Sequence, residues 1–129
     1  MKALLLAAML CGSGAMAQQA RTNSDQAKGP VATYSQKTLL KNWTMSVCLA
    51  KVAKTQDAKE DANAAASAYM EFGKLPIEAY EPLRELADRF AKRTYGGSIQ
   101  SDFNTMKCID LMHSSELDTL ATRLAKSAK

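Results

Sequence analysis

Apolar residues recur three and four positions apart through most of residues 34–129, which is the spacing of amphipathic helices. The pattern predicts helices over residues 34–54, 58–72, 77–94 and 103–113, and a last helix that begins at Ser114-Ser115. No segment reads as a credible strand. We therefore predict an all-α fold, a compact bundle of about five helices.

The helix predicted at residues 34–54 is apolar around most of its circumference, which is typical of a central helix with others packed around it. Thr55-Gln56-Asp57 interrupts the pattern and offers a cap for the alanine-rich helix at 58–72. The alanines permit close approach of a neighbouring helix. Gly73 is expected to end that helix with a positive φ.

The helix predicted at residues 77–94 has the clearest division into two faces. One face carries Tyr80, Leu83, Leu86 and Phe90, and the other carries Glu78, Glu81 and Glu85 among its charged residues. Pro76 suits a first helical turn. Pro82 removes a backbone hydrogen bond within this segment, and because the apolar stripe continues in phase past it, we expect one bent helix rather than two.

The stretch Tyr95-Gly96-Gly97-Ser98-Ile99-Gln100 separates this helix from the next one. Ser101 or Asp102 is expected to cap the helix at 103–113, whose apolar residues should be mostly buried; they are Phe103, Met106, Cys108, Ile109, Leu111 and Met112. Asp118 follows Ser115 by three residues, which resembles a capping box at the start of the last helix.

Residues 1–17 have the layout of a secretory signal peptide. A positive start precedes an apolar run, and Ala15-Met16-Ala17 forms an A-x-A cleavage site. A membrane anchor and lipidation at Cys11 are the alternatives, but the run is short and Leu10 is not the small residue that lipidation prefers. We expect cleavage after Ala17, export through the inner membrane, and a flexible polar tail over residues 18–33.

Cleavage would leave two cysteines, Cys48 and Cys108, and an exported chain favours a disulfide between them. Two free thiols or a metal pair are the alternatives, with no C-x-x-C and only one histidine to support them. The bridge would close a loop of about 60 residues, for which chain entropy gives roughly 4 kcal/mol.

The sequence offers little for catalysis or for cofactors. The formal net charge of +4 is mild and its basic residues are interspersed with acidic ones, so nucleic-acid binding is not expected. His113 is expected at a helix end, the three glutamates on a solvated face, and Gly96-Gly97 lacks the lysine of a phosphate loop. We predict no enzyme activity, no cofactor and no metal site. By periodicity alone, YGGSIQ is best read as a plain helix connection.

Several blocks together resemble the immunity proteins of type VI secretion amidase effectors, specifically the fourth Tai class. The markers are Asn42-Trp43 with Cys48, Asp61-Ala62-Asn63-Ala64, Phe72-Gly73, Pro76-Ile77-Glu78-Ala79-Tyr80 and Met106-Lys107-Cys108-Ile109-Asp110. The resemblance covers nearly all of residues 34–121. A periplasmic helical structural or stress-related module without an amidase partner is the alternative.

The resemblance implies a periplasmic all-α protein, usually a homodimer, that inhibits a secreted Cys/His amidase. Such an enzyme cleaves peptidoglycan between D-glutamate and diaminopimelate, and the immunity protein occupies its substrate groove with a protruding loop. In this chain the loop maps onto Gly96, Gly97, Ser98, Ile99 and Gln100. Glu78, Glu81 and Glu85, from the third helix of the other subunit, are implied as further contacts. No membrane contact is expected after cleavage.

Overall fold

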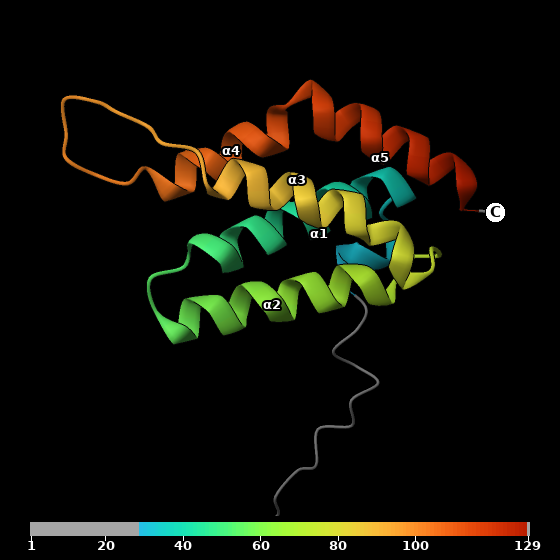
Figure 1. Cartoon of the computed structure of the whole chain (residues 1–129). Coiled ribbons are helices and arrows are strands. Elements are labelled where there is room, and N and C mark those ends of the chain that lie inside the picture. The colour runs from blue at the N-terminus through green and yellow to red at the C-terminus, as the bar shows by residue number, and fades with distance from the viewer. Residues whose placement is uncertain (1–28, 129) are drawn as a thin grey trace, which may run out of the picture.

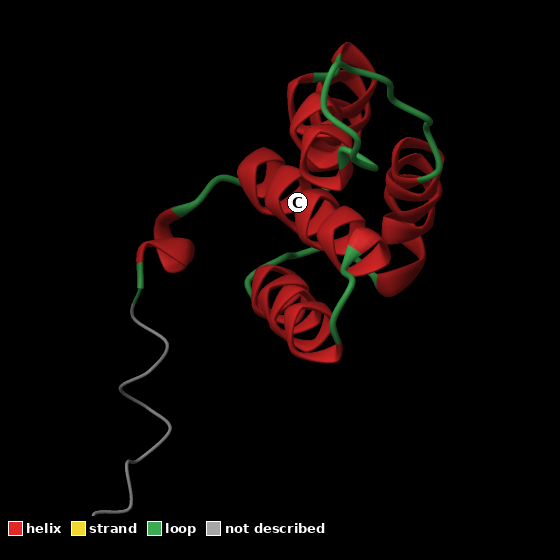
Figure 2. Cartoon of the chain, turned by 90° about the vertical axis from the view of Figure 1, so that its left-hand side faces the viewer, coloured by secondary structure: helices red, strands yellow, loops and turns green. Residues whose placement is uncertain are grey.

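The computed structural model describes residues 29–128, and all regular elements among them are helices (Figures 1 and 2). In chain order they are the 3-10 helix η1 (Pro30–Thr33), α1 (Gln36–Val52), α2 (Gln56–Glu71), the 3-10 helix η2 (Ile77–Tyr80), α3 (Glu81–Ala91), α4 (Asn104–His113) and α5 (Ser115–Ser127). The all-α prediction is confirmed. The predicted signal peptide, with Cys11 and Ala17, lies outside the described residues, as do residues 18–28 of the predicted tail, whose last residues form η1.

Helix α1 is the central element, as its apolar circumference predicts. It contacts α2, α3, α4 and α5, with α2 on one side and the other three on the opposite side (Figure 1). Ser35 caps it by accepting a hydrogen bond from the backbone N–H of Thr38. The largest fully buried side chains belong to α1 and to the elements packed on it; they are Trp43, Tyr80, Phe90, Leu40, Leu83, Leu86, Leu111 and Leu117.

The predicted disulfide is confirmed. Cys48 of α1 is bonded to Cys108 of α4, and neither residue is accessible to solvent. The bridge connects residues that are 60 positions apart, so it ties the central helix to the helix that follows the predicted loop. Within residues 29–128, none of the helices has the length and hydropathy that a membrane span requires.

The end of α2 corrects one prediction. Thr55 caps the helix as expected, by accepting from the N–H of Ala58. Gly73, however, does not have a positive φ. A Cβ at this position would overlap the Tyr80 hydroxyl and come within 3.1 Å of the Met70 carbonyl oxygen. Glycine is therefore needed here for close packing and not for a left-handed backbone.

Pro82 also differs from its prediction. The segment starts as the 3-10 helix η2 and changes to α-helix at Glu81, which places Pro82 in the first turn of α3. A first-turn residue has no intrahelical partner for its N–H, so proline breaks no hydrogen bond there. The apolar stripe is confirmed, but α3 ends at Ala91 instead of residue 94.

The caps of the last two helices differ from the predicted ones. Phe103, in a left-handed conformation, precedes α4, and neither Ser101 nor Asp102 caps it. Ser114 caps α5 by accepting from the N–H of Leu117. Asp118 forms no capping box, because its carboxylate pairs with α1 through Lys37 and Lys41; the Nζ distances are 2.8 and 3.3 Å.

The apolar residues of α4 are less buried than predicted. Cys108 and Leu111 face the core, but Met106 and Ile109 are 48% and 43% exposed. Helix α4 packs on α1, α3 and α5. Two large apolar side chains therefore remain on the surface of α4.

Candidate functional site

The connection between α3 and α4, residues 92–103, projects beyond the helical body (Figure 1). Figure 2 faces this end and shows it as a long arch between two helices. All five residues of the predicted loop, Gly96, Gly97, Ser98, Ile99 and Gln100, are exposed. Ile99 is the most exposed large apolar side chain of the described residues, at 73%. The structure therefore places the predicted segment at a projecting tip.

The first arm of this loop is fixed to α4. The Tyr95 hydroxyl donates a hydrogen bond of 2.5 Å to Oδ2 of Asp110. This bond to the carboxylate raises the pKa of Tyr95, so the tyrosine stays protonated and able to donate. The Arg93 guanidinium lies 3.4 Å from the centre of the Phe90 ring, which holds the chain where it leaves α3.

The second arm is fixed to the C-terminal end of α1. Lys54 pairs with Asp102 at 2.8 Å, and this ion pair lowers the pKa of the aspartate. Asn104 Nδ2 donates to the carbonyl oxygen of Val52 at 3.1 Å, so it pairs one of the carbonyl groups that the end of a helix leaves free. The ion pair is well exposed and stabilises little by itself, but it adds to the nearby disulfide in fixing this arm.

Phe103 closes the base of the loop between the two arms. Its φ of 50° makes it the only non-glycine residue with a positive φ among residues 29–128. Its N–H donates to the Ser101 hydroxyl, and its ring lies against Gly97, where an added Cβ would be 2.9 Å from Cζ. At Gly96 an added Cβ would meet nothing within 4 Å. The two adjacent glycines therefore have different roles.

A small apolar hollow of about 350 Å³ lies inside the loop, lined by Tyr95, Gly96, Gly97, Ser98, Ile99, Phe103 and Met106. Sequence reasoning identified the tip but missed the residues that hold it, Tyr95, Phe103, Asp102 and Lys54. Tyr95 bonds to Asp110 of α4, and Asp102 pairs with Lys54 just after α1, so only long-range information identifies these contacts. Phe103 was predicted as the first residue of a helix, and a phenylalanine there gives no signal for a left-handed backbone.

The three glutamates lie elsewhere. Glu78 is in η2, at the end of the molecule opposite the loop, and Glu81 and Glu85 are on α3 (Figure 1). All three are exposed, and Glu81 is 3.5 Å from Arg84. Within one chain the structure does not bring Glu78 together with the loop.

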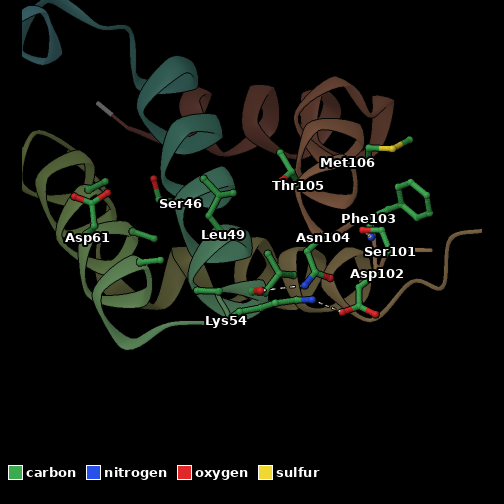
Figure 3. A pocket seen from close by; sticks show the side chains of 15 residues that line it. Ser46, Leu49, Lys54, Asp61, Ser101, Asp102, Phe103, Asn104, Thr105 and Met106 are labelled. Carbon is green, nitrogen blue, oxygen red and sulfur yellow. Dashed lines mark hydrogen bonds and ion pairs between the residues drawn. The ribbon is translucent and has the colours of Figure 1, made fainter. Parts of the chain in front are cut away.

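A second hollow, missed by sequence reasoning, lies beside the loop (Figure 3). We call it the lateral groove. It has a volume of about 650 Å³ and three walls: residues 46–54 at the end of α1 and just after it, residues 58–65 of α2, and residues 101–106 at the end of the loop and the start of α4. Its only available sequence signal was the set of alanines on α2.

The chemistry of the described residues favours binding over catalysis. Within residues 29–128 no three His, Cys, Asp or Glu side chains gather as a metal site. His113 is exposed at the C-terminal end of α4, and both cysteines of this region are in the disulfide. What the fold presents is a projecting loop with fixed arms and an adjacent groove.

Comparison with known proteins identifies the family of this chain. Residues 38–121 match the model of the family Tai4, described as type VI secretion system (T6SS) amidase immunity protein. A chain in the structure of the effector–immunity system Tae4/Tai4 from Salmonella typhimurium is 50% identical; the match covers 74% of this chain and 95% of that one, with a TM-score of 0.71. No curated protein sequence matches the chain.

Two further structures are similar. One is the complex of the effector Tae4 from Salmonella typhimurium with the immunity protein Tai4 from Enterobacter cloacae, at 31% identity and a TM-score of 0.62. The other is the Tae4–Tai4 complex from Enterobacter cloacae, at 31% and 0.63. Each match covers 70% of this chain and 93% of the other. The chain therefore belongs to the family of type VI secretion system amidase immunity proteins, Tai4.

Proposed function

We propose that this chain binds a type VI secretion amidase effector and inhibits it by occupying its substrate groove with Gly96–Gln100. Inhibition in this way would protect the producing cell and its siblings from the effector. The observation that carries the proposal is the projecting loop whose two arms are fixed by contacts with α1 and α4. Solved complexes of Tae4 with Tai4 support an effector as the partner.

The loop has properties that favour insertion into a cleft. Glycines at 96 and 97 remove side-chain bulk, and Ile99 offers an apolar side chain that is 73% exposed. Because the arms are held in the free protein, little conformational entropy remains to be lost when the tip binds. An apolar side chain buried in the centre of an interface is a typical source of binding energy.

The periplasm is the proposed place of action. The A-x-A motif at Ala15-Met16-Ala17 supports export with cleavage after Ala17. The buried Cys48–Cys108 disulfide supports an oxidising compartment. In that compartment the effector, a Cys/His amidase, would cleave the peptide stem of peptidoglycan between D-glutamate and diaminopimelate.

A homodimer is proposed as the inhibitory unit, with Glu78, Glu81 and Glu85 of the second subunit as further contacts of the effector. Their exposure supports this role, as does Ile77, which is 65% exposed beside Glu78. The separation of Glu78 from the loop within one chain is consistent with contacts supplied by two subunits.

A purified effector tests the proposal. Tae4 from Salmonella typhimurium is a suitable probe, because this chain is 50% identical to a chain of that effector–immunity system. We expect the two proteins to co-purify and the immunity protein to stop Tae4 from cleaving isolated peptidoglycan. Undiminished cleavage with an excess of this protein would contradict the proposal for that effector class.

A further inference from the structure

We propose that the lateral groove is a second docking site for the same effector, and that it takes a lysine or arginine side chain from the rim of the effector's substrate groove. The inference rests on the proposed function. It adds a contact that neither the projecting tip nor the three glutamates supply.

The first argument is continuity with the loop. Residues 101–106 form one wall of the lateral groove and are also the end of the 92–103 loop and the start of α4. Met106 lines both the lateral groove and the hollow inside the loop, and it is 48% exposed between them. A cleft that encloses the loop tip therefore brings its rim against Met106 and the entrance of the lateral groove.

The second argument is the apolar lining. Much of the lining surface is carbon. It comes from Leu49 and Val52 of α1 and from three alanines of α2, at positions 58, 62 and 65. The alanines leave room that larger side chains would fill. A volume of about 650 Å³ is within the range of about 300–1,000 Å³ that is typical of ligand sites. The groove therefore has space for a long side chain.

The third argument is charge. Three charged side chains line the groove, Lys54, Asp61 and Asp102. Lys54 and Asp102 are paired with each other at 2.8 Å, at the edge shown in Figure 3, and offset each other's charge. Asp61 has no ion pair among residues 29–128, so it is the one carboxylate of the groove lining without a cationic partner there.

These three features select the occupant. A lysine or arginine has an aliphatic stem that packs on carbon surface and a cationic head that needs an anion. In the lateral groove the stem would lie over the alanines and the head would reach the Asp61 carboxylate. An acidic side chain would meet repulsion from Asp61, and a fully apolar one would leave this carboxylate covered without a partner.

The experiment measures binding of the full protein to Salmonella typhimurium Tae4 by calorimetry. Ala58→Trp fills the groove, and Ala64→Trp places the same side chain on an exposed position of α2 outside it. Asp61→Lys reverses the charge at this position, and Glu60→Lys makes the same charge change on the adjacent exposed residue, which does not line the groove. Circular dichroism checks that all four variants fold.

We expect Ala58→Trp and Asp61→Lys each to weaken Tae4 binding by about 10-fold or more, as loss of an interface anchor does, and the two controls to stay within about 2-fold. Normal binding by both groove variants, with binding lost in Ile99→Asp, would overturn this inference and leave the loop proposal intact. If Ala58→Trp weakens Tae4 binding and Asp61→Lys does not, the inference that the groove takes a cationic side chain is wrong. If the unmodified protein does not bind Tae4, the proposed function itself fails.

Discussion

The ring of Phe103 lies so close to Gly97 that a Cβ at residue 97 would be 2.9 Å from Cζ of the ring. Gly97 belongs to the tip and Phe103 is the last residue before α4, so their contact holds the tip against the base of the loop. Phe103 holds this position with a φ of 50°, which is unfavourable for a bulky residue and is maintained by its surroundings. The shape of the projecting tip therefore depends on a glycine at 97 and on an aromatic ring at 103.

Replacing Gly97 with valine is expected to displace the tip from Phe103, because the branched side chain cannot occupy the space against the ring. Tae4 affinity should fall by about 10-fold or more, in the range of an interface hot spot, while the helical circular dichroism stays unchanged. Gly96→Ala is the matched control for loop geometry, since its Cβ would meet nothing within 4 Å. Equal binding by Gly97→Val and the unmodified protein would refute the packing role.

Removing the disulfide tests how much of the fold depends on it. The double variant Cys48→Ala/Cys108→Ala is expected to lose about 2–5 kcal/mol of unfolding free energy in urea titration. The loss has two sources, which are the freed loop of 60 residues and the space left by two fully buried sulfurs. The same midpoint for both proteins would show that the bridge does not stabilise this fold.

Gly73 and Tyr80 form a second close contact, which a double-mutant cycle can measure. Gly73→Ala should cost about 1–3 kcal/mol of unfolding free energy, because the methyl group overlaps the Tyr80 hydroxyl. That hydroxyl is buried without a hydrogen-bond partner, and burial raises the pKa of Tyr80. Tyr80→Phe should therefore cost little alone and should recover much of the loss in Gly73→Ala. Additive effects in thermal unfolding would argue against the contact.

Asp118 gives the fold a dependence on acid pH. Hydrogen bonds from Lys37 and Lys41 lower the pKa of Asp118 in the folded state below the value of about 3.9 in unfolded chains. Its contribution is complete above the unfolded pKa and is lost as pH falls toward the lower, folded pKa. Unfolding free energy should therefore fall less between pH 7 and pH 3 in Asp118→Asn than in the unmodified protein.

Urea titrations at both pH values measure this difference. Asp61→Asn is the control, because Asp61 makes no ion pair within the described region. The same acid sensitivity in Asp118→Asn and the unmodified protein would show that the bridge from α5 to α1 does not stabilise the fold.

Local patterns predicted the helices because each helix buries a stripe of its own apolar side chains, and the spacing of these residues is visible in the sequence. The central place of α1 follows from its apolar circumference, and the Thr55 cap follows from a break in the pattern. The disulfide followed from cysteine number and an expected oxidising compartment. Membership of an immunity family likewise agrees with the prediction that the chain is not an enzyme.

The errors concern contacts between different elements, which the pattern within one element does not show. Gly73 looks like a helix end with positive φ until Tyr80 is placed beside it. Asp118 looks like part of a capping box until α1 brings two lysines to it. The lateral groove needs three separate segments to be assembled, so no local pattern identifies it. The loop tip was identified from family resemblance, and the contacts that hold it came from the structure.

The most direct test of the central claim is inhibition of Tae4 by the variant Ile99→Asp. Ile99 is exposed at the loop tip and contributes nothing to the core, so the variant should fold normally. If the tip enters the substrate groove, a charge at its apolar contact should raise the concentration needed to stop peptidoglycan cleavage by about 10-fold or more. Inhibition by Ile99→Asp at the same concentration as the unmodified protein would contradict the claim that this loop blocks the effector.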